Sequence, residues 1–163
     1  MPAKTGLAAY SINRSLIVLG LGAFLSGHAQ AATQCAPTTG AQQAVILTIQ
    51  KMMDALRNQN DAAYRELLAP EFSAYDGGEQ LNQQSFWDLV ARARASGKKF
   101  EWSVTEPEVH VDCNMAWIRY INDGSVEDAS GKKPVKWLES GVFEYRRGRW
   151  TIAFVHSTRA TTR

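Results

Sequence analysis

The residues best placed for chemistry in this sequence are centred on Arg119. Arg119 falls in the middle of a predicted strand, where a charge is costly unless it is paired. A tight turn at Cys113-Asn114 would bring Glu108 and His110 of the preceding strand next to it on one face of a sheet. This set would suit an anion or a polar ligand. Alternatively, Glu108 or Glu139 neutralises Arg119 in an internal ion pair.

Other chemical motifs are sparse. His110 and His156 do not belong to any metal-binding spacing of histidine or cysteine, and the sequence has no Gly-rich phosphate loop and no Gly-x-Ser-x-Gly elbow. We therefore expect neither a metal nor a cofactor. Tyr75 and Trp87 are candidates for contact with a flat ligand, although large aromatic side chains in a small domain more often pack in the core.

The first 31 residues have the pattern of a signal peptide. Lys4 and Arg14 precede an uncharged apolar run at 16–25, and Ala29-Gln30-Ala31 offers a cleavage step. The run is about half the roughly 20 residues that a membrane-spanning helix needs, so we expect cleavage and no stable membrane anchor. We expect the mature protein to be periplasmic or secreted.

Cleavage would remove two of the 18 basic side chains and none of the 16 acidic ones, so the mature chain would carry no net charge. Binding to nucleic acid depends mainly on neutralising phosphates. We therefore do not expect a nucleic-acid partner.

Cys35 and Cys113 both remain after cleavage. In an oxidising compartment two cysteines in a small domain are more often bridged than free, so we predict a disulfide that ties the N-terminal arm to the sheet. Two free thiols are the alternative. A lipid anchor on Cys35 is disfavoured because Gln34 occupies a position where such sites have a small residue.

The hydrophobic pattern predicts helices first and strands afterwards. An extended arm at 32–41 precedes a helix that begins at Gln42, a short second helix from Asp61 to Leu68, a strand at 72–75 and a third helix capped by Asn82 and ended by Gly97. Strands are then predicted at 100–111, 115–125, 135–146 and 150–158. This order favours one α+β domain over 42–159, with a tail at 160–163.

The last predicted strand has apolar residues on both faces. In a regular strand Ile152 and Phe154 point one way and Ala153 and Val155 the other, whereas a sheet with one wet face alternates apolar with polar residues. We therefore expect a second copy of the chain to cover one face, with Ile152, Phe154 and His156 in a homodimer interface.

Three stretches of this sequence resemble the nuclear transport factor 2-like superfamily: the proline-led strand at 106–111, the strand at 115–120 and the last hairpin at 137–157. The likeness is greatest to SnoaL-like domains and to the association domain of calcium/calmodulin-dependent protein kinase II. The resemblance implies a cone-shaped α+β fold, with three N-terminal helices packed on a curved, mostly antiparallel sheet. It also implies a pocket between helices and sheet, and dimerisation through the other sheet face.

The resemblance also bears on single residues. Arg119 matches an arginine that lines the pocket in the kinase association domain, but Gly141 stands where a second arginine would fall. Ketosteroid isomerases place a catalytic carboxylate near the end of an early strand, which makes Asp76 a weak candidate for a general base. The tyrosine that those enzymes contribute from the first helix is missing here. His156 matches a histidine of the family, and we expect it to have a structural role.

These observations favour an exported, homodimeric domain that binds a small molecule in a pocket. One alternative is an enzyme of the SnoaL-like or ketosteroid-isomerase-like kind that transfers protons in the pocket. The other is a purely structural dimerisation module. A polar pair of residues deep in the pocket would favour the enzyme, and a pocket filled by tryptophan and phenylalanine would favour the structural module.

Overall fold

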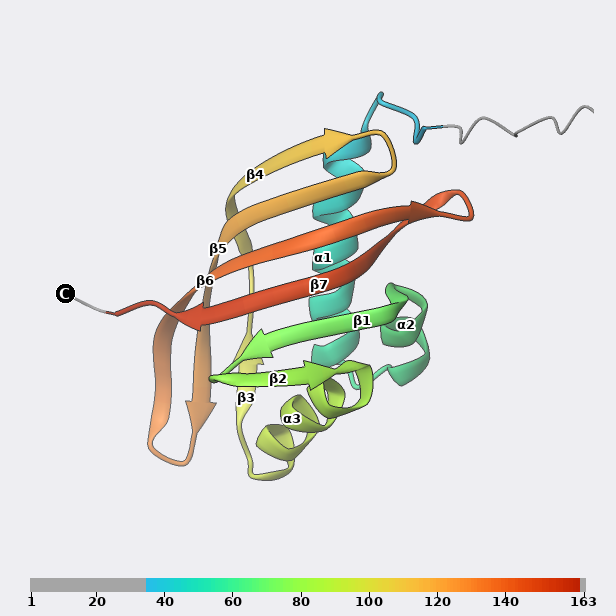
Figure 1. Ribbon diagram of the computed structural model, residues 1–163. Coiled ribbons are helices and arrows are strands. Elements are labelled where there is room, and N and C mark those ends of the chain that lie inside the picture. Colours follow the sequence, from blue (N-terminus) through green and yellow to red (C-terminus); the bar gives the residue numbers. More distant parts are fainter. Residues whose placement is uncertain (1–34, 162–163) are drawn as a thin grey trace, which may run out of the picture. The chain divides into compact units, whose positions relative to one another are not determined.

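The computed structural model describes residues 35–161 (Figure 1). The predicted signal peptide at 1–31 and part of the predicted arm and tail lie outside this range. Its elements are α1 (Ala41–Arg57), α2 (Asp61–Glu66), β1 (Leu68–Asp76), β2 (Glu79–Asn82), α3 (Gln83–Ala95), β3 (Lys99–Glu101), β4 (Val104–Asp112), β5 (Met115–Asp128), β6 (Gly131–Arg146) and β7 (Arg149–Arg159). None of the helices in the described range is long and apolar enough to cross a membrane.

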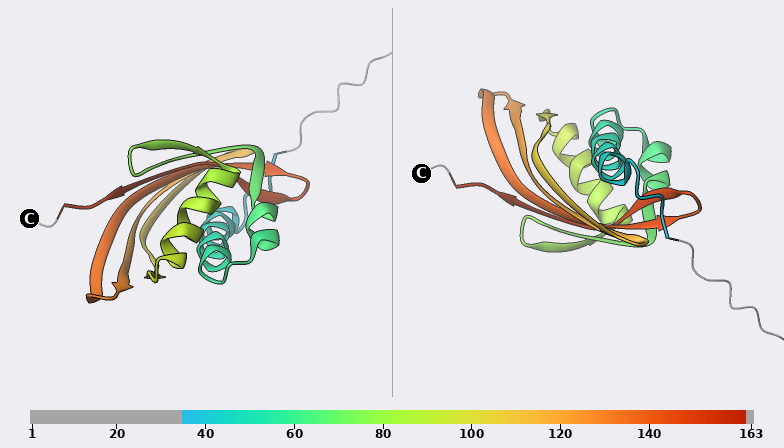
Figure 2. Two further views of the ribbon diagram at one scale, coloured as in Figure 1. Left: turned by 90° about the horizontal axis from the view of Figure 1, so that it is seen from below. Right: turned by 90° about the horizontal axis from the view of Figure 1, so that it is seen from above.

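The seven strands form one curved sheet in the order β2-β1-β7-β6-β5-β3, and β4 also pairs with β5. All pairs are antiparallel except the parallel pair of β1 with β7. Helices α1 and α3 lie on the concave side of this sheet (Figure 2). We call the face toward these helices the inner face and the opposite one the outer face. The predicted α+β class with a mostly antiparallel sheet is confirmed.

The helices begin and end where the sequence provides caps. Asn60 accepts a hydrogen bond from the Ala63 backbone N–H (3.1 Å) at the start of α2. Asn82 and Ser85 form a reciprocal capping box at the start of α3, with the Ser85 backbone N–H donating to Asn82 (2.9 Å). Helix α3 follows β1 and β2, so it is not N-terminal to the sheet as expected.

The strands differ from the predicted ones at both ends of the sheet. β1 begins at Leu68 instead of Phe72, and the unpredicted β2 pairs back on it. The single strand predicted at 100–111 is divided into β3 and β4. Gly124 lies opposite this break, and a Cβ atom there would be 2.0 Å from the Glu101 carbonyl oxygen. Only glycine therefore lets the chain near β3 approach β5 so closely.

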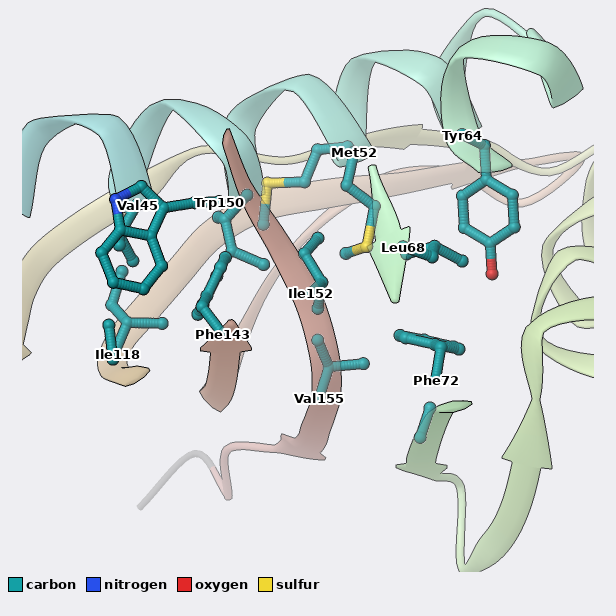
Figure 3. Close-up of a cluster of buried hydrophobic side chains, with 14 of the residues drawn as sticks. Val45, Met52, Tyr64, Leu68, Phe72, Ile118, Phe143, Trp150, Ile152 and Val155 are labelled. Carbon is teal, nitrogen blue, oxygen red and sulfur yellow. The ribbon is translucent and has the colours of Figure 1, made fainter. Parts of the chain in front are cut away.

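The core lies between α1 and the inner face of the sheet (Figure 3). Its largest fully buried side chains are Tyr64, Phe143, Ile49, Ile118, Ile152 and Val45. Figure 3 shows Ile152 and Val155 of β7 both within this cluster. The cluster is the main source of stability, because each large aliphatic or aromatic side chain removed from water contributes about 1.5–3 kcal/mol.

Cys35 and Cys113 form the predicted disulfide, with a Cα–Cα distance of 4.5 Å. The bridge joins the segment before α1 to the turn between β4 and β5. Next to it, the Ala36 backbone N–H donates to the Asn114 side chain (2.8 Å), and Ala36 is buried. The N-terminal segment is therefore fixed to the sheet both covalently and by a hydrogen bond.

Candidate functional site

A cavity of about 250 Å³ lies between the inner face of the sheet and helices α1 and α3. Its walls are mainly apolar and include Met52, Met53 and Leu56 from α1, Phe86, Leu89, Val90 and Ala93 from α3, and Phe100, Trp102, Trp137 and Val155 from the strands and the β3–β4 link. A group of polar side chains lies at one end of the cavity. This polar group consists of Asp76, Tyr120, Asn122, Glu139 and Ser157.

The strand register explains why the polar group gathers there. Tyr120 of β5 is paired with Glu139 of β6, Glu139 with Ser157 of β7, and Ser157 with Asp76 of β1. Paired residues point to the same face of a sheet, so these four side chains form a row across four strands. Asn122 lies two residues beyond Tyr120 and therefore joins the row on the same face.

Glu139 is held by several donors. The Asn122 side-chain amide donates to Glu139 Oε1 (3.2 Å), and the Ser157 hydroxyl donates to the same oxygen (3.0 Å). Tyr120 also hydrogen-bonds to Glu139. The amide of Asn122 is itself oriented, because its oxygen accepts a hydrogen bond from the Ser103 backbone N–H (3.1 Å) and its nitrogen is thereby directed toward Glu139.

Burial dominates the electrostatics of the polar group. It raises the pKa of the Glu139 carboxyl, whereas the hydrogen bonds from Tyr120, Asn122 and Ser157 lower this pKa. The charge of the nearby Asp76 also raises it, and the net direction is upward. Burial also raises the pKa of the Asp76 carboxyl, while the hydrogen bond from the Gly77 backbone N–H and the nearby His156 lower it. The pKa of the Tyr120 hydroxyl is raised well above its ordinary value by burial and by Glu139. The cavity thus holds two carboxyl groups that take up protons more readily than exposed ones.

Arg119 does not reach this cavity. It lies on the outer face of β5, where its Nε donates to Glu108 Oε2 (2.9 Å) in an exposed ion pair. His110 lies on the same face and its ring stacks on that of Trp117, with centroids 5.7 Å apart. Of the two ion pairs considered for Arg119, the one with Glu108 is present. The one with Glu139 is wrong, because consecutive residues of a strand point to opposite faces and Glu139 is on the inner face with Tyr120.

Tyr75 and Trp87 also lie outside the cavity lining. Tyr75 is on the outer face and is 47% exposed, and its ring packs edge-on against Phe154 with centroids 5.2 Å apart. Trp87 packs against the buried Tyr64, with ring centroids 5.3 Å apart. Among the ligand-contact residues expected from the sequence, only Glu139 lies in the inner cavity, together with the candidate base Asp76.

The expectation for the last strand needs a correction at Ile152. The register of β6 with β7 shifts between Val142 and Phe143, so Phe143 pairs with Ile152 and Val142 with Phe154. This β-bulge breaks the alternation and turns both Ile152 and Val155 inward. Ile152 is fully buried in the core and is not available to a partner. Phe154 and His156 remain on the outer face.

Sequence reasoning missed Tyr120, Asn122 and Ser157 as site residues. A signal for the first two was present. Ala116, Ile118, Tyr120 and Asn122 alternate along one strand, and the first two of them had to face the core. The polar end of the cavity follows from continuing that alternation toward the C-terminal end of the strand.

Residues 35–161 contain no group of three histidine, cysteine, aspartate or glutamate side chains placed to hold a metal ion. The polar group offers hydrogen bonding and proton exchange. Its two carboxyl groups, one hydroxyl of tyrosine, one of serine and one amide can accept hydrogen bonds from a bound molecule, donate to it, or exchange protons with it.

The fold is similar to several solved structures. A protein of the NTF2-like family from Streptomyces avermitilis, titled a candidate dehydratase, has a TM-score of 0.68 at 13% identity over 77% of this chain and 100% of its own. The association domain of CaMKII from C. elegans has a TM-score of 0.63 at 18% identity, over 74% and 96%. A candidate ketosteroid isomerase from Shewanella frigidimarina has a TM-score of 0.59 at 21% identity, over 69% and 92%.

At these identities the likeness shows the fold alone. Among curated proteins, none is similar enough in sequence to count as a relative. The model of the SnoaL-like domain matches residues 45–161, which include both helices of the cavity wall and all seven strands. The chain therefore belongs to the SnoaL-like family and has an NTF2-like fold.

Proposed function

We propose that this domain binds a small molecule with an apolar body and one polar end in the inner cavity. The observation that carries the proposal is a single cavity that combines apolar walls with the polar group at one end. Ligand pockets usually have this composition and span about 300–1,000 Å³, so a cavity of about 250 Å³ suits a molecule of one or two rings. In a purely structural module we would expect tryptophan and phenylalanine side chains to fill this space, whereas here they line the cavity and leave it open.

The donors around Glu139 indicate which end of the ligand it would contact. Tyr120, Asn122 and Ser157 all direct hydrogen bonds at this carboxyl group. Glu139 is thereby held as an acceptor, and its remaining lone pairs accept a hydrogen bond from a ligand. We assign Glu139 the role of holding a hydrogen-bond donor at the polar end of the ligand.

Asp76 is the better candidate for proton exchange. Its carboxyl is held by the Gly77 backbone N–H, and burial raises its pKa toward the range in which a general base works at neutral pH. A carboxyl group of this kind could remove a proton from the bound molecule and return it elsewhere. The pair of Asp76 and Glu139 at the end of an apolar cavity is the arrangement that favours the enzyme alternative over simple binding.

The binding proposal can be tested by filling the cavity. Ala93 lines it from α3, and Ala93→Phe would occupy part of its volume. Saturation-transfer NMR against a panel of one- and two-ring alcohols, amides and amines should give signals with the unmodified protein and none with this variant. Ala129→Phe, in the exposed turn between β5 and β6, is the matched control and should bind like the unmodified protein. Equal binding by both variants would disprove the assignment of the cavity.

The proton-transfer role has its own test. Once a ligand is found, Asp76→Asn should still bind it, at some loss of affinity, but should stop its isomerisation, elimination, or exchange of carbon-bound hydrogen with deuterated water. If the unmodified protein binds the ligand and promotes none of these reactions, the domain is a binding module and the enzyme alternative is wrong.

We also propose self-association through the outer face. Four of its side chains are large, apolar and well exposed: Tyr75 (47%), Met115 (49%), Trp117 (41%) and Leu138 (55%). Together with Phe154 they extend across β1, β7, β6 and β5, and large apolar side chains gathered on one exposed face often mark a contact with another protein surface. A second copy that applies the same face would cover these side chains symmetrically.

Export is proposed from residues 1–31 and is supported by the Cys35–Cys113 disulfide, because such bridges persist in oxidising compartments. The intact mass of protein from a periplasmic or culture fraction should correspond to a chain that begins at Ala32. A full-length product retained in the cytoplasm would contradict export.

A further inference from the structure

The inner cavity has a strongly one-sided set of charges. Two carboxyl groups, Asp76 and Glu139, line it, and no lysine or arginine within residues 35–161 does so. The guanidinium of Arg57, which follows the wall residue Leu56, is not among the lining groups and donates to Asp54 (2.8 Å) and to the Trp102 carbonyl oxygen (3.0 Å). The cavity therefore has no fixed cation to balance its carboxyl groups.

His156 is the one titratable base among the lining residues. It extends from the outer face of β7, where its ring packs edge-on against Tyr75 with centroids 6.2 Å apart and its Nε2 lies 3.1 Å from the Thr158 hydroxyl. These contacts keep the imidazole at the rim on the outer side of the sheet. It does not form an ion pair with Glu139 inside the cavity in the structure.

Several of the other lining residues are aromatic. Phe100 and Trp102 stack with their ring centroids 5.1 Å apart and 13° between their planes, and Trp137 and Phe86 add further rings. The faces of aromatic rings carry partial negative charge and attract cations, tryptophan most strongly. Aromatic walls and carboxyl groups thus favour the same kind of ligand, one with a positive charge on an apolar body.

We propose that the ligand of this cavity carries a protonated amine, which Glu139 binds while the aromatic wall covers the apolar body. This inference rests on the proposed function, since it names the chemical class of the molecule bound at the same site. A buried carboxylate is stabilised most by a hydrogen-bonded cation, and an ammonium group supplies both the charge and the donors that Glu139 can still accept. An anionic ligand would meet two carboxyl groups, with only the imidazole of His156 at the rim and no lysine or arginine among the lining residues.

A matched series of ligands tests the inference. 2-Phenylethylamine, 2-phenylethanol and 3-phenylpropanoate share a ring and a short chain and differ in having a positive, neutral or negative end. Affinities are measured by isothermal titration calorimetry on the mature protein at neutral pH. We expect the amine to bind about tenfold or more tightly than the alcohol, because a charge-assisted hydrogen bond is about twice as strong as a neutral one, and the propanoate not to bind.

Variants then locate the charge recognition. Glu139→Gln should lower the affinity for the amine to that for the alcohol and leave the affinity for the alcohol nearly unchanged. Asp76→Asn is a second variant, which should lower the affinity for the amine by a smaller factor. Glu71→Gln removes an exposed carboxylate that pairs with Arg146 and is the matched control, with no change expected for any of the three ligands. Circular dichroism checks that each variant is folded.

The possible failures can be told apart. Equal binding of amine and alcohol, or tighter binding of the propanoate, would overturn the amine inference and leave the cavity as a site for neutral or acidic molecules. Unchanged amine affinity in both Glu139→Gln and Asp76→Asn would overturn it as well. If none of the three compounds binds, and none of the wider NMR panel does, the proposed function itself fails.

Discussion

The two faces of the central sheet are built from the same strands but have opposite characters. On the inner face, polar side chains are few, shielded and bonded to one another next to an apolar cavity, as with Glu139, Asn122 and Ser157. On the outer face, charged side chains pair in the open, and large apolar ones such as Trp117 and Leu138 are exposed. This difference is the basis on which we propose separate tasks for the faces: ligand binding for the inner one and contact with a second copy for the outer one.

Residues that are adjacent in the sequence lie on opposite faces of the sheet and therefore have different surroundings. Arg119 and Tyr120 are consecutive, as are Glu139 and Ser140, yet one member of each pair lies outside and the other lines the cavity. Burial, not sequence proximity, raises the pKa of the carboxyl groups on the inner face. The predictions that follow test this division, beginning with the largest expected effect.

The largest effect should come from truncating a core side chain of β7, and truncating an outer-face side chain of the same strand is the contrast. Ile152→Ala removes a fully buried side chain from the inner face and should lower the free energy of unfolding by about 2–5 kcal/mol. Phe154→Ala, two residues away on the half-buried outer face, should cost clearly less. Urea denaturation with the disulfide intact measures both. Equal losses would mean that the bulge does not separate these residues as the structure shows.

Phe154→Glu should affect self-association without loss of the fold. A carboxylate in an apolar interface loses its water without gaining a partner, which costs roughly 2 kcal/mol or more and shifts the protein toward monomers. Sedimentation velocity should show a dimer for the unmodified mature protein and for the exposed-turn control Ala129→Glu, and a monomer for Phe154→Glu. A monomeric unmodified protein at micromolar concentration would disprove the outer-face interface.

The inner carboxyl groups should make stability depend on pH in a defined direction. Because burial raises the folded-state pKa of Asp76 and Glu139 above the ordinary 3.8 and 4.5, the folded state binds their protons more tightly than the unfolded state. Stability is therefore lost as pH rises from about those values through the raised ones. Each carboxyl contributes to this loss in proportion to how far folding raises its pKa.

As pH rises from mildly acidic to mildly alkaline, the double variant Asp76→Asn, Glu139→Gln should lose less of its free energy of unfolding than the unmodified protein does. Urea denaturation at several pH values measures this loss. Glu101→Gln is an informative contrast, because the hydrogen bond from Lys132 lowers the pKa of this exposed carboxyl and its contribution has the opposite sign. The same pH profile for the double variant and the unmodified protein would argue against buried, protonatable carboxyl groups in the cavity.

Much of the fold could be predicted because it follows from local signals. The cap at Asn82, the turn at Cys113-Asn114 and the alternation along β5 and β6 are all visible in the sequence, and the disulfide follows from cysteine number and the predicted compartment. What failed depends on non-local geometry. The bulge at Ile152 is set by how β7 pairs with β6, and β2 exists because it pairs back on β1.

The candidate site was predicted less well for the same reason. Asp76 was named through a family likeness and Glu139 as a partner for Arg119, and both lie in the cavity for reasons of strand register. The alternation along β5 places Asn122 on the inner face but does not show which group it meets, and Ser157 gave no local signal, since an isolated hydroxyl in a strand has no distinctive spacing. Their importance appears only when three strands, β5, β6 and β7, place them within hydrogen-bonding distance of one carboxyl group.

The smallest effect is expected at the residues that first seemed most suited to chemistry. The Glu108–Arg119 pair lies on the outer face, with 54% and 69% of the two side chains exposed. Exposed ion pairs contribute about 0–1 kcal/mol because water screens them and because two long side chains lose conformational freedom. A double-mutant cycle with Glu108→Ala and Arg119→Ala should therefore give a coupling energy below about 1 kcal/mol, and neither change should alter binding of a ligand in the cavity. A large loss of ligand affinity on Arg119→Ala, in a variant that remains folded and associated, would show that the ligand binds on the outer face around Arg119. The assignment of the two faces would then have to be reversed.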